Sequence, residues 1–473
     1  MAPPPSSSLS IVNLLTILCI CISTPSSSSH TTLTLSLTHH ITPKTNNQSS
    51  HLKHTINSLA SSSITRAHYL KNPNNNTSSS STQIPLFPRS YGAYSISLSF
   101  GSPPQKLPFL MDTGSSLVWS PCTNNYRCYD CRFSDVNQTN TPKFIPNRSS
   151  SAKMIGCNSK ECGWVSGSSQ QTPCNGNESC PAYTIQYGSG STSGFLISDT
   201  LDFPEGDVSD FAVGCSIVST RQPSGIAGFG RGSSSLPNQM GVKKFSYCLV
   251  SHRFDDAPVS SELVLVRNST NSTNSTNSTA GGSEMSYTNF QKNPMNSSEA
   301  FQEYYYVNLR EITIGGKSVN ISNEYLVPGA DGNGGAIIDS GTTFTVMDNV
   351  PYDLVAREFE NQMSEYKRAV DVESETGLRP CFDVTGKSAE LPEFTFHFVG
   401  GAKLSLPVAD YFSFVGDDGD DGVLCMTIVS SNLIGSNSSI GPSIIVGNYQ
   451  QQDIYFEYDL ENGVLGFRKQ ICK

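Results

Sequence analysis

Two short stretches of this chain are near-copies of each other, one in each half. Residues 109–116 read FLMDTGSS and residues 336–343 read AIIDSGTT. In each copy the apolar run predicts a buried strand, and the Gly with its small hydroxyl neighbours predicts a tight turn at the end of that strand. A single Asp-Thr-Gly is a weak signal, because these are ordinary turn residues. Two copies in the same context predict two similar lobes, each of which presents one carboxylate at a shared interface.

Asp112 and Asp339 are therefore the candidate catalytic residues. Two carboxylates held close together cannot both ionise cheaply, so we expect the pair to hold one proton across the acidic range. The charged member can take a proton from a water molecule, while the protonated member gives one to a substrate carbonyl. This chemistry hydrolyses a peptide bond without a covalent intermediate. The alternative, that both Asp residues merely cap turns, does not account for the duplicated context.

The hydroxyl groups beside each Asp have expected partners as well. Thr113 and Ser340 can tie the two loops together, and we expect the next hydroxyl residue of each loop to donate a hydrogen bond to the outer carboxylate oxygen. The residues expected to support the pair are Thr113, Gly114, Ser115, Ser340, Gly341 and Thr342.

The N-terminus and the cysteines predict a secreted protein. The apolar run at residues 11–22 and the Ser/Thr/Pro-rich sequence after it fit a signal peptide over residues 1–24, and the run is too short to span a membrane. Two of the 14 Cys lie in this segment, and the remaining twelve are an even number that fits disulfides in an oxidising compartment. The disulfide candidates are Cys122, Cys128, Cys131, Cys157, Cys162, Cys174, Cys180, Cys215, Cys248, Cys381, Cys425 and Cys472.

The distribution of these cysteines predicts a bridge between the two halves. Nine lie in the N-terminal half and three in the C-terminal half, so complete pairing requires at least one disulfide that joins the halves. Cys381 and Cys425 can close a local loop, which leaves Cys472 as the expected C-terminal partner. The sequence Cys128-Tyr129-Asp130-Cys131 has the spacing of half a zinc site, but no second pair or His lies nearby.

Asn-Xaa-Ser/Thr motifs are frequent, and in a secreted protein they mark candidate glycosylation sites. Four of them follow one another in a low-complexity repeat that cannot fold on itself, which predicts a flexible linker loop over residues 267–300. The candidates are Asn137, Asn147, Asn177, Asn268, Asn271, Asn274, Asn277, Asn296, Asn320 and Asn437.

Residues 25–85 form a cationic segment in front of an acidic body. The segment has no Asp or Glu, but it contains six of the eight His and four of the 30 Lys and Arg, which are Lys44, Lys53, Arg66 and Lys71. The rest of the chain therefore has 26 basic residues against 40 Asp and Glu, a net charge of −14. Opposite charges predict a prosegment that covers an acidic cleft, and the alternative is a disordered linker.

The remainder of the chain has the pattern of a mostly β protein. Residues 94–100 alternate with period two, and similar short runs separated by Gly-rich turns continue on both sides of the Asn-Ser-Thr repeat. One segment, residues 351–366, predicts a helix with an apolar stripe. The predicted lobes are an N-terminal lobe at 86–266, with a Cys-rich insert at 122–180, and a C-terminal lobe at 301–473.

From about residue 90 onward these motifs resemble the pepsin-like aspartic proteases. Besides the two Asp loops, Trp119 lies where the family has a buried Trp, and residues 187–194 (YGSGSTSG) are similar to the flap hairpin. Each lobe also has an apolar-apolar-Gly sequence downstream of its Asp, at 226–228 and 445–447. The resemblance implies a mostly β, bilobal acid protease fold with the active-site cleft between the two lobes.

The resemblance also implies roles for particular residues. Tyr187 corresponds to the flap tyrosine, so Tyr187 and Gly188 are candidate substrate-binding residues. The alternatives are that Tyr187 is a plain strand aromatic and that Trp119 is a plain core residue.

The Cys-rich insert resembles the plant nepenthesin-type, or atypical, group. The resemblance implies a secreted protein of the extracellular space or cell wall that acts at acidic pH on polypeptides with apolar residues at the scissile bond. We expect a monomer with no cofactor, no metal, no nucleic-acid partner and no membrane anchor. The acidic run at 417–421 lacks the spacing and closing Glu of an EF-hand loop, so a solvated turn is favoured over a calcium site.

Two other functions fit parts of the sequence. The plant xylanase-inhibitor proteins resemble these proteases and have lost catalysis, so the alternative is a catalytically silent binding or inhibitor protein on the same scaffold. Both Asp loops and Tyr187 are intact in this chain, which favours the protease. A pair of carboxylates can also serve glycoside hydrolysis, but that function does not explain the symmetric duplication.

Overall fold

The structure is a computed structural model, and it describes residues 29–39, 48–71, 93–131, 141–165, 178–187, 190–203, 206–222, 224–251, 260–269, 284–294, 299–386, 389–415, 422–431 and 441–472. Several predicted features lie outside the described residues. They are the signal peptide 1–24, the acidic run 417–421, Gly188, Cys174, the side chain of Asn268, and the sequons at Asn137, Asn177, Asn271, Asn274, Asn277, Asn296 and Asn437.

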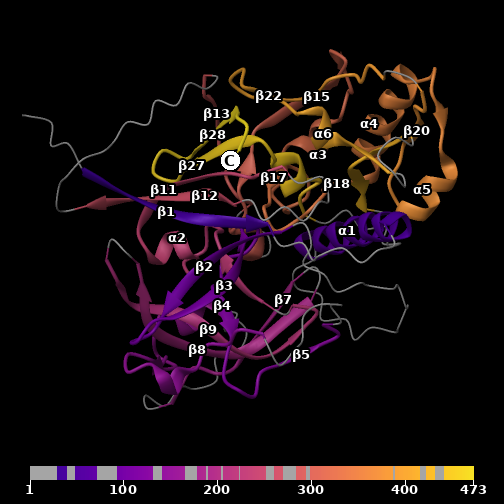
Figure 1. Cartoon of the computed structure of the whole chain (residues 1–473). Helices are drawn as coiled ribbons and strands as arrows, with labels where there is room; N and C mark the ends of the chain where they lie inside the picture. Colours follow the sequence, from indigo (N-terminus) through magenta and orange to yellow (C-terminus); the bar gives the residue numbers. More distant parts are fainter. Residues whose placement is uncertain are drawn as a thin grey trace, which may run out of the picture.

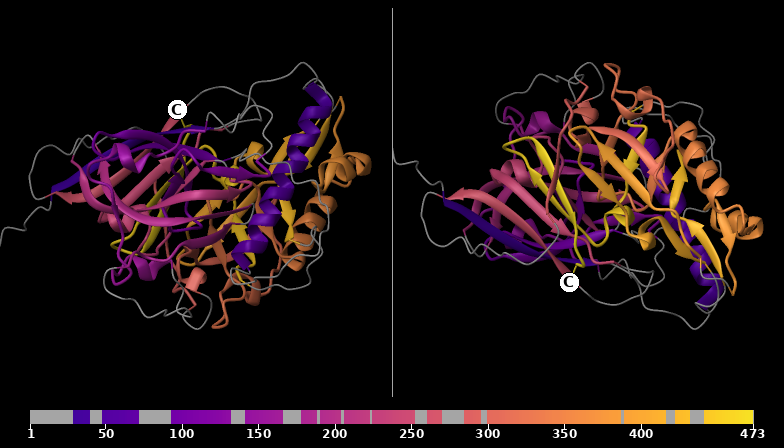
Figure 2. Two further views of the ribbon diagram at one scale, coloured as in Figure 1. Left: turned by 90° about the horizontal axis from the view of Figure 1, so that it is seen from below. Right: turned by 90° about the horizontal axis from the view of Figure 1, so that it is seen from above.

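The chain folds into two lobes, and the long helix α1 (Gln48–Lys71) lies at the boundary between them (Figure 1). Strands of the N-terminal half occupy the lower part of the view, and the C-terminal half occupies the upper part. Figure 2 shows the molecule from below and from above, with α1 beside elements of the C-terminal half. The predicted mostly β, bilobal fold is confirmed.

One continuous sheet runs through both lobes. Within the described residues it has 15 strands. In spatial order its main path contains β13 (Ser286–Asn289), β28 (Val464–Lys469), β27 (Ile454–Asp459), β11 (Val242–Cys248), β12 (Ser260–Ser269), β1 (Ser29–His39), β2 (Tyr94–Phe100), β3 (Gln105–Asp112), β10 (Gly225–Gly228), β4 (Trp119–Pro121), β9 (Val208–Thr220), β8 (Gly190–Asp202) and β6 (Lys153–Met154). Off this path, β5 (Arg127–Tyr129) pairs with β9, and β7 (Tyr183–Tyr187) pairs with β8.

Three smaller sheets among the described residues belong to the C-terminal half. The first contains β14 (Tyr306–Val307), β17 (Ala336–Ile338), β26 (Ile444–Val446), β18 (Thr345–Met347) and β25 (Ile428–Ser430). The second contains β16 (Lys317–Ser318), β15 (Leu309–Ile314), β21 (Phe394–Phe398) and β22 (Lys403–Ser405). The third contains β19 (Lys367–Arg368), β20 (Cys381–Asp383), β24 (Val423–Met426) and β23 (Phe412–Phe414).

In the part of the chain that the structure describes, helices are few and mostly short. Besides α1 they are α2 (Leu236–Gln239), α3 (Asn323–Leu326), α4 (Asn349–Gln362), α5 (Val370–Thr376) and α6 (Val408–Tyr411), with 3₁₀ turns η2 (Pro146–Arg148), η3 (Cys162–Trp164), η4 (Glu299–Gln302) and η6 (Asn448–Gln451). The helix predicted at 351–366 is α4. Its apolar stripe faces the core, since Tyr352, Val355 and Phe359 are each at most 1% exposed.

The two halves are joined where β11 of the N-terminal half pairs with β27 of the C-terminal half. Across this junction the rings of Phe245 and Tyr458 stack with their centroids 4.4 Å apart. A disulfide between Cys248 and Cys472 crosses the same junction. This is the bridge between halves that the odd numbers of cysteines require.

The expectation that residues 267–300 form a linker loop is wrong for part of that range. Strand β13 lies inside it and pairs antiparallel with β28, with Tyr287 opposite Gly466. Gly466 leaves room for this pairing, because a Cβ there would lie 2.6 Å from Cε1 of Tyr287. Local composition gives no sign of β13, since its partner lies far along the chain.

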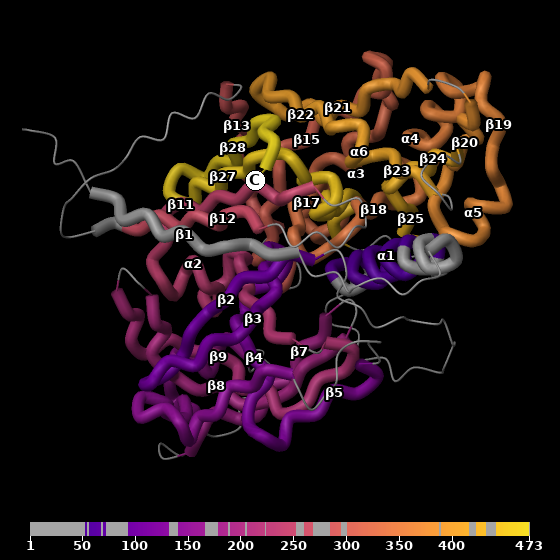
Figure 3. The backbone as a smooth tube through the Cα atoms, in the orientation of Figure 1, coloured from indigo at the N-terminus to yellow at the C-terminus, as the bar shows by residue number. Residues whose placement is uncertain are grey.

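The segment before the N-terminal lobe folds onto the body. Strand β1 inserts between β12 and β2. In the backbone tube of Figure 3, α1 lies beside α5 and β18. Its apolar residues Ile56, Leu59 and Ile64 are buried in a cluster with side chains of the C-terminal half, which include Tyr304 and Val346. The disordered-linker alternative is therefore wrong for α1. No helix in the ranges given above is long and apolar enough to cross a membrane.

Candidate active site

The two Asp residues occupy equivalent positions in the two lobes. Asp112 is the last residue of β3, and Asp339 directly follows β17. Each strand pairs in parallel with the strand formed by the downstream apolar-apolar-Gly sequence, which is β10 in one lobe and β26 in the other. The glycines are needed there, because a Cβ on Gly228 or Gly447 would collide with the backbone of the neighbouring Asp loop. The duplicated sequence thus produces a duplicated backbone.

Thr113 and Ser340 tie the two loops together, as the sequence predicts. The Thr113 hydroxyl donates to the carbonyl oxygen of Ile338 at 3.1 Å and accepts from the backbone N–H of Ser340 at 2.9 Å. The Ser340 hydroxyl makes the matching bonds, donating to the carbonyl oxygen of Met111 at 3.0 Å and accepting from the N–H of Thr113 at 3.1 Å. These four bonds fix the separation of the two loops.

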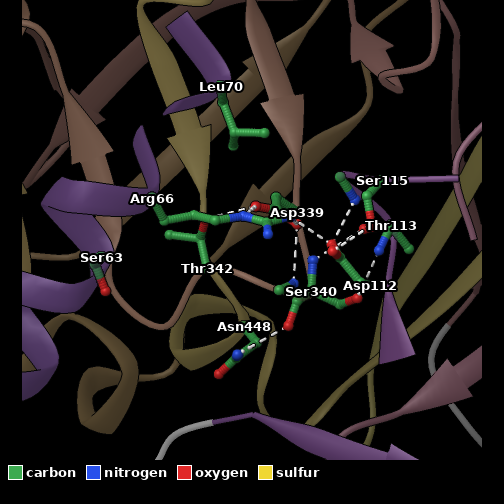
Figure 4. Close-up of polar contacts among 12 residues, drawn as sticks. Ser63, Arg66, Leu70, Asp112, Thr113, Ser115, Asp339, Ser340, Thr342 and Asn448 are labelled. Atoms are coloured by element: carbon green, nitrogen blue, oxygen red, sulfur yellow. Dashed lines mark hydrogen bonds and ion pairs between the residues drawn. The ribbon is translucent and has the colours of Figure 1, made fainter. Parts of the chain in front are cut away.

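The remaining loop residues hold each carboxylate by both of its oxygens (Figure 4). The hydroxyls of Ser115 and Thr342 donate to the outer oxygens, Oδ2 of Asp112 and Oδ2 of Asp339, each at 2.5 Å. The backbone N–H groups of Gly114 and Gly341 donate to the inner oxygens, Oδ1 of each Asp, at 2.9 Å. Both carboxylates are therefore held in one orientation.

The inner oxygens of the two carboxylates face each other across the junction of the lobes. A Cβ on Gly114 would lie 2.6 Å from Oδ1 of Asp339, so only Gly permits this approach. Asp112 is 2% exposed and Asp339 is fully buried. Burial raises the pKa of Asp112 above its usual range; the nearby charge of Arg66 opposes this shift and that of Asp339 adds to it. A buried pair with one raised pKa is suited to hold a proton that it can give away.

Arg66 of α1 lies in the middle of this pair (Figure 4). Its Nη2 is 2.5 Å from Oδ1 of Asp112 and 3.5 Å from Oδ1 of Asp339, and its Nε is 3.2 Å from Oδ2 of Asp339. Burial opposes the charge of the guanidinium, but the two carboxylates outweigh this effect and raise the pKa of Arg66 above its ordinary value. The guanidinium thus occupies the space between the inner oxygens of the two carboxylates.

Further contacts anchor α1 on the C-terminal lobe. The hydroxyl of Ser63 accepts from the backbone N–H of Phe344 at 2.7 Å. At the end of the helix, Nζ of Lys71 lies 2.7 Å from Oδ1 of Asp348, and both side chains are buried. Near the start of the helix, Lys53 and Glu375 form a more exposed ion pair. The excess of positive charge in residues 25–85 signals such contacts, but it does not say which cation reaches the Asp pair.

The predicted flap tyrosine is at the end of β7, where β7 and β8 form an antiparallel hairpin. Nε1 of Trp119 donates to the hydroxyl of Tyr187 at 2.8 Å. Trp119 is fully buried, and Tyr187 is 5% exposed. Helix α1 also contacts β7, so it touches the hairpin as well as the C-terminal lobe.

The described cysteines form disulfides throughout both lobes. The bonded pairs are Cys122–Cys215, Cys128–Cys131, Cys162–Cys180, Cys248–Cys472 and Cys381–Cys425, and Cys157 is also disulfide-bonded. Cys128 and Cys131 bond to each other, so they do not form half of a zinc site. Among the sequons that the structure describes, Asn147 and Asn320 are exposed.

Comparisons with known proteins agree with this geometry. Family models described as xylanase inhibitor N-terminal and xylanase inhibitor C-terminal match residues 94–265 and 304–469. The chain is 34% identical over 423 residues to a probable aspartyl protease of Arabidopsis thaliana, covering 80% of this chain and 82% of the relative. It is 32% identical over 405 residues to aspartic proteinase nepenthesin-2 of Nepenthes gracilis, covering 84% of this chain and 81% of the relative.

Solved structures share the fold at lower identity. The crystal structure of edgp matches with a TM-score of 0.58 at 18% identity, covering 80% of this chain and 92% of that one. Basic 7S globulin from soybean matches with a TM-score of 0.55 at 16% identity, covering 80% and 93%. The sequence relatives, the family models and the paired Asp loops lead to one conclusion: the chain belongs to the pepsin-like aspartic protease family, in its plant nepenthesin-type group.

Proposed function

We propose that this protein is a secreted aspartic endopeptidase that hydrolyses peptide bonds at acidic pH. The observation that carries the proposal is the intact pair, Asp112 and Asp339, with every supporting hydrogen bond in both loops. A water placed where Nη2 of Arg66 now lies would contact both inner oxygens. The ionised carboxylate takes its proton, and the protonated one donates to the substrate carbonyl.

We further propose that residues 25–85 are a prosegment, which holds the enzyme inactive through Arg66. The family models begin to match at residue 94, so α1 lies before the residues that they match. Arg66 fills the position of the reacting water, and α1 packs against β7, which carries the flap tyrosine. In this form a peptide cannot reach the pair.

The family places further expectations on the mature enzyme. Its substrates are polypeptides with apolar residues at the scissile bond, and it works as a monomer in the extracellular space or cell wall. The disulfides support an oxidising compartment. Tyr187 closes over the bound peptide and excludes water.

The alternative function is a catalytically silent binding protein, as the names of the matching family models suggest. The decisive experiment is to acidify the purified protein and measure hydrolysis of a denatured protein substrate with and without pepstatin. We expect hydrolysis in acid that pepstatin abolishes. A protein that releases the N-terminal segment but cleaves nothing would be a binding protein on the same scaffold.

A further inference from the structure

The end of α1 contacts a second buried carboxylate on the C-terminal lobe, apart from the Asp pair. Lys71 is 1% exposed, and its Nζ lies 2.7 Å from Oδ1 of Asp348, which is 4% exposed. The hydroxyl of Ser431 donates to the same oxygen at 3.2 Å. A buried ammonium is costly unless a carboxylate compensates it, so Asp348 sits where a cation can be held away from water.

The surroundings of Lys71 also hold its backbone. Gly441 lies directly against it, because a Cβ on Gly441 would be 2.6 Å from Cα of Lys71. The hydroxyl of Tyr304 donates to the carbonyl oxygen of Leu70 at 3.3 Å. The C-terminal lobe thus supplies a donor for a peptide carbonyl and a carboxylate for the adjacent side chain, which are the two elements of a specificity subsite.

One oxygen of Asp348 is left over. Among the residues that the structure describes, none forms a hydrogen bond with Oδ2 of Asp348, although this atom is buried. The ammonium group of Lys71 donates to Oδ1 of Asp348. A guanidinium carries a second N–H in a geometry that reaches both oxygens of a carboxylate, so the position suits arginine as well as lysine.

We propose that, once α1 has left the cleft, Asp348 forms a substrate subsite for a lysine or arginine side chain. This inference rests on the proposed function, because a substrate subsite requires that the protein binds a peptide substrate. Arg66 and Lys71 are five residues apart, which is about 7.5 Å along a helix axis. An extended peptide covers that distance in about two residues. The basic side chain should therefore lie about two positions from the scissile bond, and the residues at the bond itself remain apolar.

The test measures binding and not turnover. It uses the acidified protein, freed of released fragments, and two pairs of peptides with a reduced, uncleavable bond at the scissile position. Lysine is exchanged for norleucine two residues before that bond in one pair and two residues after it in the other. Affinities are measured by calorimetry at about pH 5.5, where the lysine side chain of the peptide is charged.

We expect the lysine peptide of one pair to bind about tenfold more tightly than its norleucine partner, as a buried charge-assisted hydrogen bond implies. Asp348→Asn should bring the two affinities together. Asp353→Asn is the matched control, because it removes an exposed carboxylate from the adjacent helix α4 and should leave the wild-type ratio.

Three results overturn the subsite: equal affinities within both pairs for the wild type, a lysine preference that persists in Asp348→Asn, or failure of every peptide to bind. The wild-type comparison alone decides the matter if Asp348→Asn does not fold. A lysine preference in a protein that hydrolyses nothing would reject the proposed protease and leave the subsite standing.

Discussion

At the scale of single residues, the two carboxylates should be equally indispensable. Asp112→Asn and Asp339→Asn each keep the shape of the side chain and remove its acid-base function, so each should lower kcat to below a few per cent of wild type. Circular dichroism should show an unchanged fold, because the amide oxygen of Asn can still accept from the backbone N–H of Gly114 or Gly341, and its NH2 group can donate to the neighbouring hydroxyl. Substantial activity in either variant would mean that the pair is not the catalytic centre.

Arg66 is the residue on which the inactive state should depend most. Arg66→Ala removes the guanidinium from between the carboxylates, so activity should appear at a higher pH than in wild type. The measurement is hydrolysis of a fluorogenic peptide by freshly purified full-length protein over a pH series.

Lys53→Ala is the control for Arg66→Ala. Lys53 belongs to the same helix, but its ion pair with Glu375 is partly exposed, and such pairs contribute little. We expect this variant to activate at the wild-type pH. An Arg66→Ala protein that does the same would reject the blocking role of Arg66.

The residues of the pair were predictable from sequence, and Arg66 was not. Asp112, Asp339 and their hydroxyl neighbours belong to a short motif that occurs twice in the sequence. Their hydrogen bonds therefore follow from the local geometry of two equivalent loops. Arg66 is one of four cations in a segment without acids, and its partners lie 46 and 273 residues further along the chain. The opposite charges of residues 25–85 and the rest of the chain indicate that the segment docks. Only the folded helix shows that Arg66 is the cation that reaches the two carboxylates.

At the scale of elements, the β7–β8 hairpin should depend on the bond between Trp119 and Tyr187. Tyr187→Phe leaves Nε1 of Trp119 buried without its acceptor, so we expect a loss of about 1–3 kcal/mol in the free energy of unfolding and a lower kcat/KM. Kinetics and denaturant unfolding, compared with those of wild type, check both effects. Because Tyr187 is only 5% exposed, we expect its side chain to contribute to stability as well as to substrate binding.

Tyr129→Phe is the control for the hairpin. Tyr129 is 56% exposed on β5, so removal of its hydroxyl should change neither quantity. If Tyr187→Phe retained the wild-type kcat/KM, the hydroxyl of Tyr187 would have no part in placing the flap.

Strand pairing shows where sequence patterns stop being informative. Helix α4 was predictable because its stripe repeats within one element. Strand β13 was not, because its pairing with β28 depends on register across about 180 residues of intervening chain and on the missing side chain of Gly466.

At the scale of the whole molecule, docking of α1 should depend on pH with a definite sign. Arg66 binds the carboxylates in their ionised form, and removing it takes a positive charge away from Asp112, whose pKa burial has already raised. Loss of this charge therefore makes the pKa of Asp112 higher in the undocked than in the docked state. Docking is fully stabilised above the undocked pKa, and this stabilisation is lost as the pH falls through the docked pKa. The six His of residues 25–85 gain charge in acid and oppose release of the prosegment. The 40 Asp and Glu, which lose charge in acid, outnumber them several-fold.

The full-length protein should therefore be stable near neutrality and mature in acid. The cut is expected between about Asn74 and Tyr94, in a stretch that lies mostly outside the described residues; it begins just after the last anchored residue, Lys71. The measurement is N-terminal sequencing of the secreted protein before and after acidification, in wild type and in Asp112→Asn. Self-activation predicts a new N-terminus only in acidified wild type. If Asp112→Asn already carries the mature end at neutral pH, another protease removes the leader, and Arg66 then serves to keep the pair blocked until that protease acts.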